Sequence, residues 1–199
     1  MNTSSSGAIE FVLASASPRR ADLLRSLGLQ FRIVVTDIDE SLVPGESPTT
    51  YVERLARSKA LAAPVGPDSV VLGADTTVAL DDTILGKPAD ADEARSMLRS
   101  LSGRTHTVYT GVALRRADTV VSTVVATGVT FRHLDDATVE WHIATGEAFD
   151  KAGGYGMQGY GGAFVASIVG SPSNVVGLPL HVLDELATQL GVGLASVRS

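Results

Sequence analysis

Short apolar segments alternate with amphipathic segments along this chain, and the alternation restricts the fold more than any other feature of the sequence. A short apolar run predicts a buried strand, whereas apolar residues at i, i+3 and i+4 predict a helix. Strands separated by helices favour parallel pairing, because the chain must cross back over the sheet. We expect strands over residues 9–14, 31–35, 70–73, 76–80 and 163–169, and helices over residues 18–27, 50–63, 92–101 and 179–190, with one more from a cap at Asp135 or Asp136 to Ile143.

Residues 105–114 and 119–131 are two long β-branched runs joined by a short turn at Ala117-Asp118. Such a pair predicts an antiparallel hairpin. Parallel crossovers together with a hairpin predict the α/β class, with a mixed twisted sheet and flanking helices. The length of 199 residues suits one sizeable domain. We expect that domain over residues 9–192, a disordered tail over residues 1–8 and a flexible tail over residues 193–199.

The charge and composition of the chain argue against several classes of function. A net charge of −6 does not suit a general nucleic-acid binder, which needs a basic surface. The sequence has no cysteine, and its histidines lack the spacing of a zinc site. It contains no apolar run of the roughly 18 residues that span a membrane, and its start does not resemble a secretory signal. We therefore expect a cytoplasmic protein without a membrane or nucleic-acid partner.

Two adjacent arginines lie where a helix is predicted to begin. Ser17 fits the N-cap, Pro18 fits the first helical position, and Arg19 and Arg20 follow. The positive end of the helix dipole disfavours cations in the first turn, and a bound anion would remove this cost. Free backbone N–H groups, two guanidinium groups and the hydroxyls of Ser15 and Ser17 would together form a phosphate site. The alternative is that both arginines are solvated surface residues.

Two lysines also stand out by their positions. The helix predicted from Thr50, which has capping-box spacing to Glu53, places Lys59 on the same face as its apolar residues. An inward lysine either extends along the apolar surface to reach solvent or lies in a cleft. Lys87 lies in a loop between a glycine and a proline, where it either reaches a phosphate or is solvated.

Carboxylates occur at the ends of predicted strands. Asp75 lies in the segment GADTT between two strands, and Asp37, Asp39 and Glu40 follow another strand. Oxygen ligands in such loops suit Mg²⁺ or Mn²⁺, and Mg²⁺ is usually held by one or two carboxylates together with substrate phosphates. The alternative, which we favour for Asp37 and Asp39, is that these acids cap helices or solvate turns.

The stretch GGYGMQGYGG at residues 153–162 formally matches the dinucleotide-binding pattern G-x-G-x-x-G. That pattern must follow a strand and open a helix, whereas here it precedes a predicted strand, so it does not indicate a Rossmann site. Its glycines either let the backbone approach a flat ligand closely or form a structural turn.

Seven segments occur in this order along the chain: LASASPRRADLL, YVERLARSKA, VLGADTTV, LGKP, MLRSLSGRTHTVYTGVAL, DKAGGYGMQGYGGAFV and NVVGLPL. Together they resemble the Maf family of nucleoside triphosphate pyrophosphatases, over about residues 9–190. The resemblance implies hydrolysis of a nucleoside triphosphate to the monophosphate and pyrophosphate with a divalent metal. It also implies two lobes around a long cleft and a fold similar to that of inosine triphosphatase.

The resemblance further implies roles for individual residues. Asp75 corresponds to the family's proton acceptor, and Arg19, Thr76 and Gln158 correspond to its specificity positions, which here are similar to those of the group acting on dTTP and UTP. Together with the charge pattern, this predicts that Glu40 and Asp75 hold a Mg²⁺ or Mn²⁺ ion. The residues expected to bind the substrate are Ser15, Ser17, Arg19, Arg20, Lys59, Thr76, Lys87 and Gln158.

Other functions remain open at this point. The enzyme could serve nucleotide-pool sanitation with a narrow preference, or act on a broad range of ordinary or modified nucleotides. The family name is also associated with inhibition of septum formation. An alternative function is therefore that of a regulatory protein that binds a cell-division partner. The resemblance suggests a homodimer.

Overall fold

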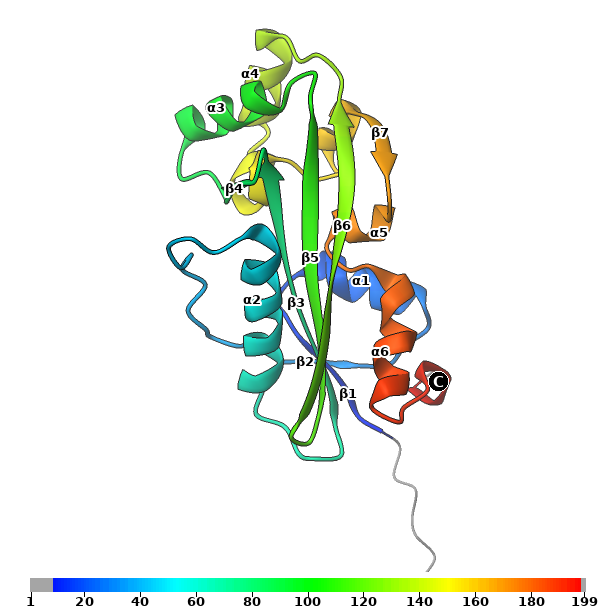
Figure 1. Ribbon diagram of the computed structural model, residues 1–199. Coiled ribbons are helices and arrows are strands. Elements are labelled where there is room, and N and C mark those ends of the chain that lie inside the picture. Colours follow the sequence, from blue (N-terminus) through cyan, green and yellow to red (C-terminus); the bar gives the residue numbers. More distant parts are fainter. Residues whose placement is uncertain (1–8, 198–199) are drawn as a thin grey trace, which may run out of the picture.

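The computed structural model describes residues 9–197, and in that part of the chain the strands form one seven-stranded sheet (Figure 1). The strand order is β2-β1-β3-β5-β6-β7, and β4 pairs with β3 beside this path. β1 pairs in parallel with β2 and β3, whereas the remaining pairs are antiparallel. The predicted mixed α/β sheet is therefore confirmed. The strands are β1 Phe11–Ala14, β2 Arg32–Ile33, β3 Val70–Leu80, β4 Thr83–Leu85, β5 Thr105–Arg116, β6 Thr119–Phe131 and β7 Val165–Val169.

The helices fall largely where the amphipathic pattern predicts them. Ser17 caps the first helix through its side chain, as predicted, and Asp135 caps the fourth. The α-helices are α1 Pro18–Ser26, α2 Pro48–Ala62, α3 Ala91–Leu101, α4 Asp136–Ala144, α5 Pro172–Val176 and α6 Leu183–Gln189. Short 3₁₀ helices are η1 Glu147–Asp150, η2 Ala152–Gly154, η3 Tyr160–Phe164, η4 Leu180–Val182 and η5 Leu194–Val197.

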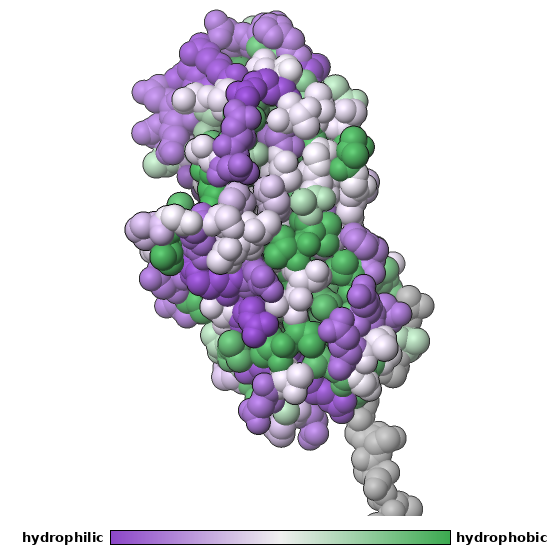
Figure 2. All heavy atoms as spheres, viewed as in Figure 1, coloured by the Kyte–Doolittle hydropathy of each residue, from purple (hydrophilic) through white to green (hydrophobic). Residues whose placement is uncertain are grey.

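Three long strands, β3, β5 and β6, run through both ends of the molecule and join two lobes (Figure 1). One lobe carries β1, β2, α1, α2 and α6, and the other carries β4, β7, α3 and α4. Each lobe has its own apolar core, around Leu24 and Leu72 in the first and around Leu98 and Phe131 in the second. In Figure 2 hydrophilic residues dominate the end that carries α3 and α4.

The structure corrects several details of the sequence-based prediction. The strands expected over residues 31–35 and 163–169 are shorter and span Arg32–Ile33 and Val165–Val169. β3 is one continuous strand through Asp75, because its backbone pairs with β5 from Val70 to Ala79 without interruption. α2 begins before Thr50, because the Ser47 hydroxyl accepts the hydrogen bond from the Thr50 N–H and so forms the cap. The last predicted helix is divided into η4 and the shorter α6.

The C-terminal segment is packed as far as it is described. η5 follows α6, and the side chains of Leu194 and Val197 are buried against the core of the first lobe. Part of the segment expected to be a flexible tail, residues 193–199, is thus packed against the core, while residues 198–199 and 1–8 lie outside the described residues. Among the described helices, none has the length and apolar character needed to cross a membrane.

Helix α2 lies against the sheet at two glycines. A β-carbon added to Gly73 on β3 would lie 2.2 Å from the Ala56 carbonyl oxygen, and one on Gly111 on β5 would lie 2.2 Å from the Val52 carbonyl oxygen. Neither strand could therefore carry a larger residue at these positions without pushing the helix away. This close approach sets the separation between α2 and the middle of β3, where Asp75 lies.

Candidate active site

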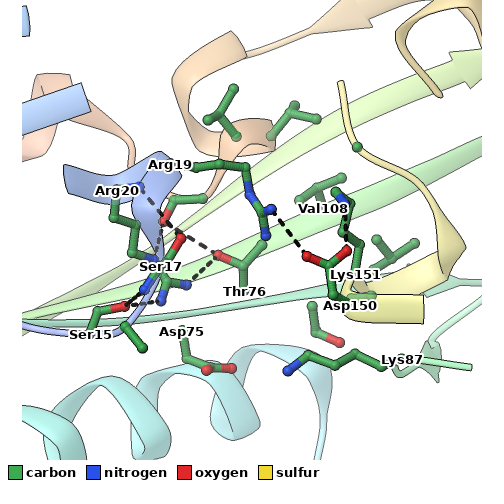
Figure 3. A pocket seen from close by; sticks show the side chains of 18 of the residues that line it. Ser15, Ser17, Arg19, Arg20, Asp75, Thr76, Lys87, Val108, Asp150 and Lys151 are labelled. Atoms are coloured by element: carbon green, nitrogen blue, oxygen red, sulfur yellow. Dashed lines mark hydrogen bonds and ion pairs between the residues drawn. The ribbon is translucent and has the colours of Figure 1, made fainter. Parts of the chain in front are cut away.

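A cavity of about 680 Å³ opens between the two lobes, and side chains from both lobes line it. Figure 3 shows it between α1, the strand β3 and the segment that carries Asp150 and Lys151. The volume is that of a typical small-molecule site. Every residue that the sequence analysis assigned to the site lines this one cavity: Ser15, Ser17, Arg19, Arg20, Glu40, Lys59, Asp75, Thr76, Lys87 and Gln158.

Lys59 lies between two carboxylates at the side of the cavity. Its Nζ is 2.6 Å from Asp75 Oδ1 and 2.7 Å from Glu40 Oε1. The Lys59 and Asp75 residues are each only 8% exposed, whereas the Glu40 side chain is half exposed. The inward-facing lysine of α2 therefore points into a cleft, the second of the two readings left open by the sequence. Its ammonium group holds the Asp75 carboxylate in a fixed position on β3.

The surroundings of Glu40 keep it ionised. Partial burial raises the pKa of this carboxyl group, but the hydrogen bond and charge of Lys59, with the charges of Lys87 and Arg20, outweigh burial. The pKa of Glu40 therefore lies below its ordinary value, and the group is a carboxylate at neutral pH. One cation and two anions leave the Glu40, Lys59 and Asp75 cluster with a net charge of −1, which favours a further cation beside it.

Arg20 is held by the protein and does not form a matched pair with Arg19. Its Nε donates to the Gly177 carbonyl oxygen at 2.8 Å, one terminal nitrogen donates to Ser15 Oγ at 3.0 Å, and the other donates to Thr76 Oγ1 at 3.1 Å. The residue is buried, and this burial lowers the pKa of the guanidinium group. Arg20 thus ties α1 to β3 and to the end of α5, and a role for it beside Arg19 in holding an anion stays a prediction.

The start of α1 also offers fewer free donors than predicted. The Ser17 N–H donates to Ser15 Oγ at 3.2 Å, and the Arg20 N–H donates to Ser17 Oγ at 3.5 Å. Both serine hydroxyls are thus engaged in ordering the turn before the helix. They shape the wall of the cavity and place Arg19 at its edge.

Arg19 and Lys87 are the cations most available to a ligand. Among the described residues, the ion pair that Arg19 makes is a long one with Asp150, at 3.7 Å, and this contact reaches from α1 to the opposite lobe. Lys87 makes no hydrogen bond or ion pair with any described residue, and in Figure 3 its amino end points toward Asp75. Both are free to neutralise a phosphate chain without first breaking a strong internal contact.

The sequence analysis missed Asp150 and Lys151. Lys151 Nζ donates to Asp150 Oδ1 at 2.5 Å and to the Glu147 carbonyl oxygen at 3.0 Å. All lysines of the chain, Lys59, Lys87 and Lys151, line the cavity. The scarcity of lysine was the signal that could have identified Lys151, because lysines that serve only solubility would be scattered over the surface.

A buried pair of side chains supports the far wall. Tyr155 lines the cavity, and its hydroxyl lies 2.7 Å from His106 Nε2. Burial lowers the pKa of His106 to about 4 and raises the pKa of Tyr155, so both groups are neutral at physiological pH. Tyr155 therefore adds an uncharged side chain to the lining of the cavity.

The carboxylates of the site fit a divalent cation only together with a substrate. The described residues include no cluster of three or more His, Cys, Asp or Glu side chains able to hold a metal. Glu40 and Asp75 nevertheless converge on one point, which is occupied by the ammonium group of Lys59. Two carboxylates completed by phosphate oxygens are a common coordination of Mg²⁺.

Comparison with known proteins gives consistent matches over nearly the whole chain. The family model described as Maf-like protein matches residues 10–190. A relative from Anaeromyxobacter dehalogenans (strain 2CP-C) is 51% identical over 187 residues, which cover 92% of this chain and 95% of that protein. A relative from Myxococcus xanthus (strain DK1622) is 53% identical over 186 residues, with 92% and 93% covered. Both relatives are named dTTP/UTP pyrophosphatase.

Solved structures align with a smaller part of the chain. A HAM1 protein from Coxiella burnetii aligns with a TM-score of 0.43 and 18% identity, over 62% of this chain and 73% of that one. A nucleoside-triphosphatase described as a dITP/XTP pyrophosphatase, from Mycobacterium abscessus, aligns with a TM-score of 0.41 and 15% identity, over 63% and 76%.

Proposed function

The chain belongs to the Maf-like protein family, and we propose that it hydrolyses nucleoside triphosphates to the monophosphate and pyrophosphate, preferring dTTP and UTP. One observation carries the proposal beyond family membership. Lys59 fixes Asp75 beside Glu40 in a cavity that Arg19 and Lys87 also face. Such a site binds a polyanion and keeps a carboxylate next to it, as attack by water on a phosphate chain requires.

The proposed reaction is attack of water on the α-phosphorus. Asp75 accepts the proton from the water, a new bond forms between the water oxygen and the α-phosphorus, and the bond to the bridging oxygen of the β-phosphate breaks. Pyrophosphate leaves with the electrons of that bond. The hydrogen bond from Lys59 keeps the Asp75 carboxylate oriented toward the cavity, so that the acceptor is in place before the substrate arrives.

The positive side chains supply the charge that a triphosphate and its leaving group need. Arg19 and Lys87 are placed to neutralise phosphate oxygens, while Arg20, whose donors are already engaged within the protein, contributes its charge from the wall of the cavity. A Mg²⁺ or Mn²⁺ ion held by Glu40 and Asp75 would, when bound, neutralise phosphate oxygens and make an adjacent water more acidic. Lys59 would continue to orient the side chains of Glu40 and Asp75 through its two ion pairs.

The proposal is tested by incubating the purified protein with each ordinary ribo- and deoxyribonucleoside triphosphate, with Mg²⁺ or Mn²⁺, and quantifying the products by chromatography. We expect monophosphate and pyrophosphate in equal amounts, fastest from dTTP and UTP. In ¹⁸O-labelled water the label should appear in the monophosphate. Label in inorganic phosphate or pyrophosphate would place the attack elsewhere, and similar rates on all nucleotides would favour the broad-range enzyme.

Lys87→Ala is expected to lower kcat/KM for UTP by about 10- to 100-fold, since it removes one charge-assisted contact to phosphate. The fold should be unaffected, because Lys87 has no hydrogen bond or ion pair with any described residue. Steady-state kinetics and thermal melting check both parts. Arg25→Ala is the matched control, because Arg25 is an exposed cation on α1 outside the cavity. An unchanged kcat/KM would show that Lys87 does not contact the phosphates and is a solvated loop residue.

Gln158→Glu is expected to change base preference more than it changes the reaction. Gln158 lies exposed at the rim of the cavity and offers both a donor and an acceptor, whereas glutamate offers only acceptors. Uracil and thymine would lose a donor to their carbonyl oxygens, while the amino group of cytosine would gain an acceptor. We expect kcat/KM for UTP and dTTP to fall about tenfold or more, with CTP unaffected or improved. Equal losses on all bases would contradict base reading by Gln158.

Three further predictions from the resemblance await solution and cell experiments. Sedimentation or light scattering would test the homodimer, localisation in cells would test the cytoplasmic assignment, and nucleotide pools in a deletion strain would test pool sanitation. No activity on any nucleotide with either metal would leave the regulatory, partner-binding reading as the better one.

A further inference from the structure

Glu147, at the start of η1, holds the glycine-rich loop at the rim of the cavity. Its Oε2 accepts a hydrogen bond from the Tyr160 N–H at 2.6 Å, and its Oε1 accepts one from the Gly161 N–H at 3.3 Å. Both carboxylate oxygens therefore bind backbone of the loop. Hydrogen bonds from backbone N–H groups to an ionised acceptor are among the stronger ones in proteins.

The glycines of this loop make room for the side chains that hold it. A β-carbon on Gly159 would lie 2.2 Å from Glu147 Oε2, and a β-carbon on Gly156 would lie 2.7 Å from the Lys151 side chain. Lys151 in turn donates to the Glu147 carbonyl oxygen. The loop is thus wrapped around Glu147 and Lys151, and the glycine run has a structural reason that does not involve a dinucleotide.

Gln158 lies inside the segment that these contacts fix. It directly precedes Gly159, and the first backbone group bound by Glu147 is that of Tyr160. The Gln158 side chain is exposed and makes no hydrogen bond with any described residue. Its position therefore depends on the backbone of the loop. An amide distinguishes one base edge from another only when its donor and acceptor are held in place.

We propose that Glu147 is a positioning residue for nucleobase recognition, which acts by fixing the loop backbone so that Gln158 faces the edge of a pyrimidine. This inference rests on the proposed function, because it assumes that Gln158 reads the base. Glu147 is not among the residues that line the cavity, so it acts through the loop and not by direct contact with the base. Its effect is therefore on the preference among bases, and it leaves the phosphate-binding side of the cavity unchanged.

The test compares Glu147→Gln with wild type on UTP, dTTP and CTP. The amide keeps the size of the side chain but sets an NH₂ group against a backbone N–H, so one of the two hydrogen bonds is lost. We expect kcat/KM for UTP and dTTP to fall about tenfold, mainly through KM, and the ratio of kcat/KM for UTP over CTP to fall by a similar factor. Glu147→Asp keeps the charge but shortens the reach, and we expect it to lower the same ratio. Glu147→Asp also provides the test of the proposal if Glu147→Gln fails to fold.

A double mutant separates this inference from the proposed function. If Glu147 acts through Gln158, then Glu147→Gln added to Gln158→Ala should not lower the UTP over CTP ratio further. Glu185→Gln, which removes an exposed carboxylate of α6, is the matched control and should leave all rates unchanged. Equal losses on all bases, or a further drop in the double mutant, would overturn the role of Glu147. A ratio that does not respond to Gln158→Ala would instead overturn base reading itself.

Discussion

Replacing Asp75 by asparagine is expected to lower kcat by about 10²–10⁴-fold, the range that a positioned general base contributes. The amide has nearly the same shape, and its oxygen can still accept the hydrogen bond that Lys59 donates to Asp75 Oδ1 at 2.6 Å. What disappears is the negative charge and the capacity to take a proton from water. Since the cations of the cavity remain, KM for UTP, measured at a saturating concentration of Mg²⁺, should stay within about threefold of wild type.

This result is measured by steady-state kinetics on UTP and dTTP, with thermal melting to verify the fold. Asp37→Asn provides a matched control, because Asp37 is an exposed carboxylate near Glu40 that does not line the cavity. The control should retain wild-type kcat, in agreement with the reading of Asp37 as a turn residue. A kcat of Asp75→Asn within threefold of wild type would assign proton acceptance to another group.

Gly73→Ala is expected to destabilise the protein by about 3 kcal/mol, the upper end of the usual cost of overpacking. The added methyl group would lie 2.2 Å from the Ala56 carbonyl oxygen and 2.7 Å from the Ala60 nitrogen. Both are backbone atoms of α2, so a side-chain rotation cannot relieve the contact and the helix must move. For a chain of this size the Tm should fall by roughly 6–12 °C.

The same substitution should also reduce turnover in the fraction that stays folded. α2 carries Lys59, and its displacement would lengthen the 2.6 Å contact between Lys59 and Asp75. Gly66→Ala adds the same methyl group at a position with no atom within 4 Å of the new carbon, and it should leave both Tm and kcat unchanged. A wild-type Tm for Gly73→Ala would show that α2 does not pack as closely on β3 as the structure has it.

The fold follows from the sequence to a large extent, because hydrophobic periodicity reports which face of an element is buried. It identified the hairpin of β5 and β6, the cap at Ser17 and the inward face of α2 that carries Lys59. It failed where the outcome depends on a distant partner. The break expected at Asp75 is absent, since the neighbouring strand β5 supplies hydrogen bonds along the whole of β3.

Most residues of the candidate site could be predicted from the sequence, but their contacts with one another could not. Arg19 and Arg20 are adjacent and chemically identical, and no local pattern separates them. The difference arises because Arg20 meets Gly177, which is far away in the chain, while Arg19 faces the opposite lobe. Glu147 went unnoticed for the same reason, since its partners are backbone groups of a loop that turns back on it.

The sequence by itself thus determined the class of fold, most of the elements and most of the charged residues that meet in one cavity. Those properties depend on residue type and on spacing along the chain, both of which the sequence contains. Only the tertiary structure decided which of these charges are already paired within the protein and which remain available to a triphosphate. That distinction depends on contacts between residues far apart in the chain, and the free energy of each contact exists only when folding brings the two partners together.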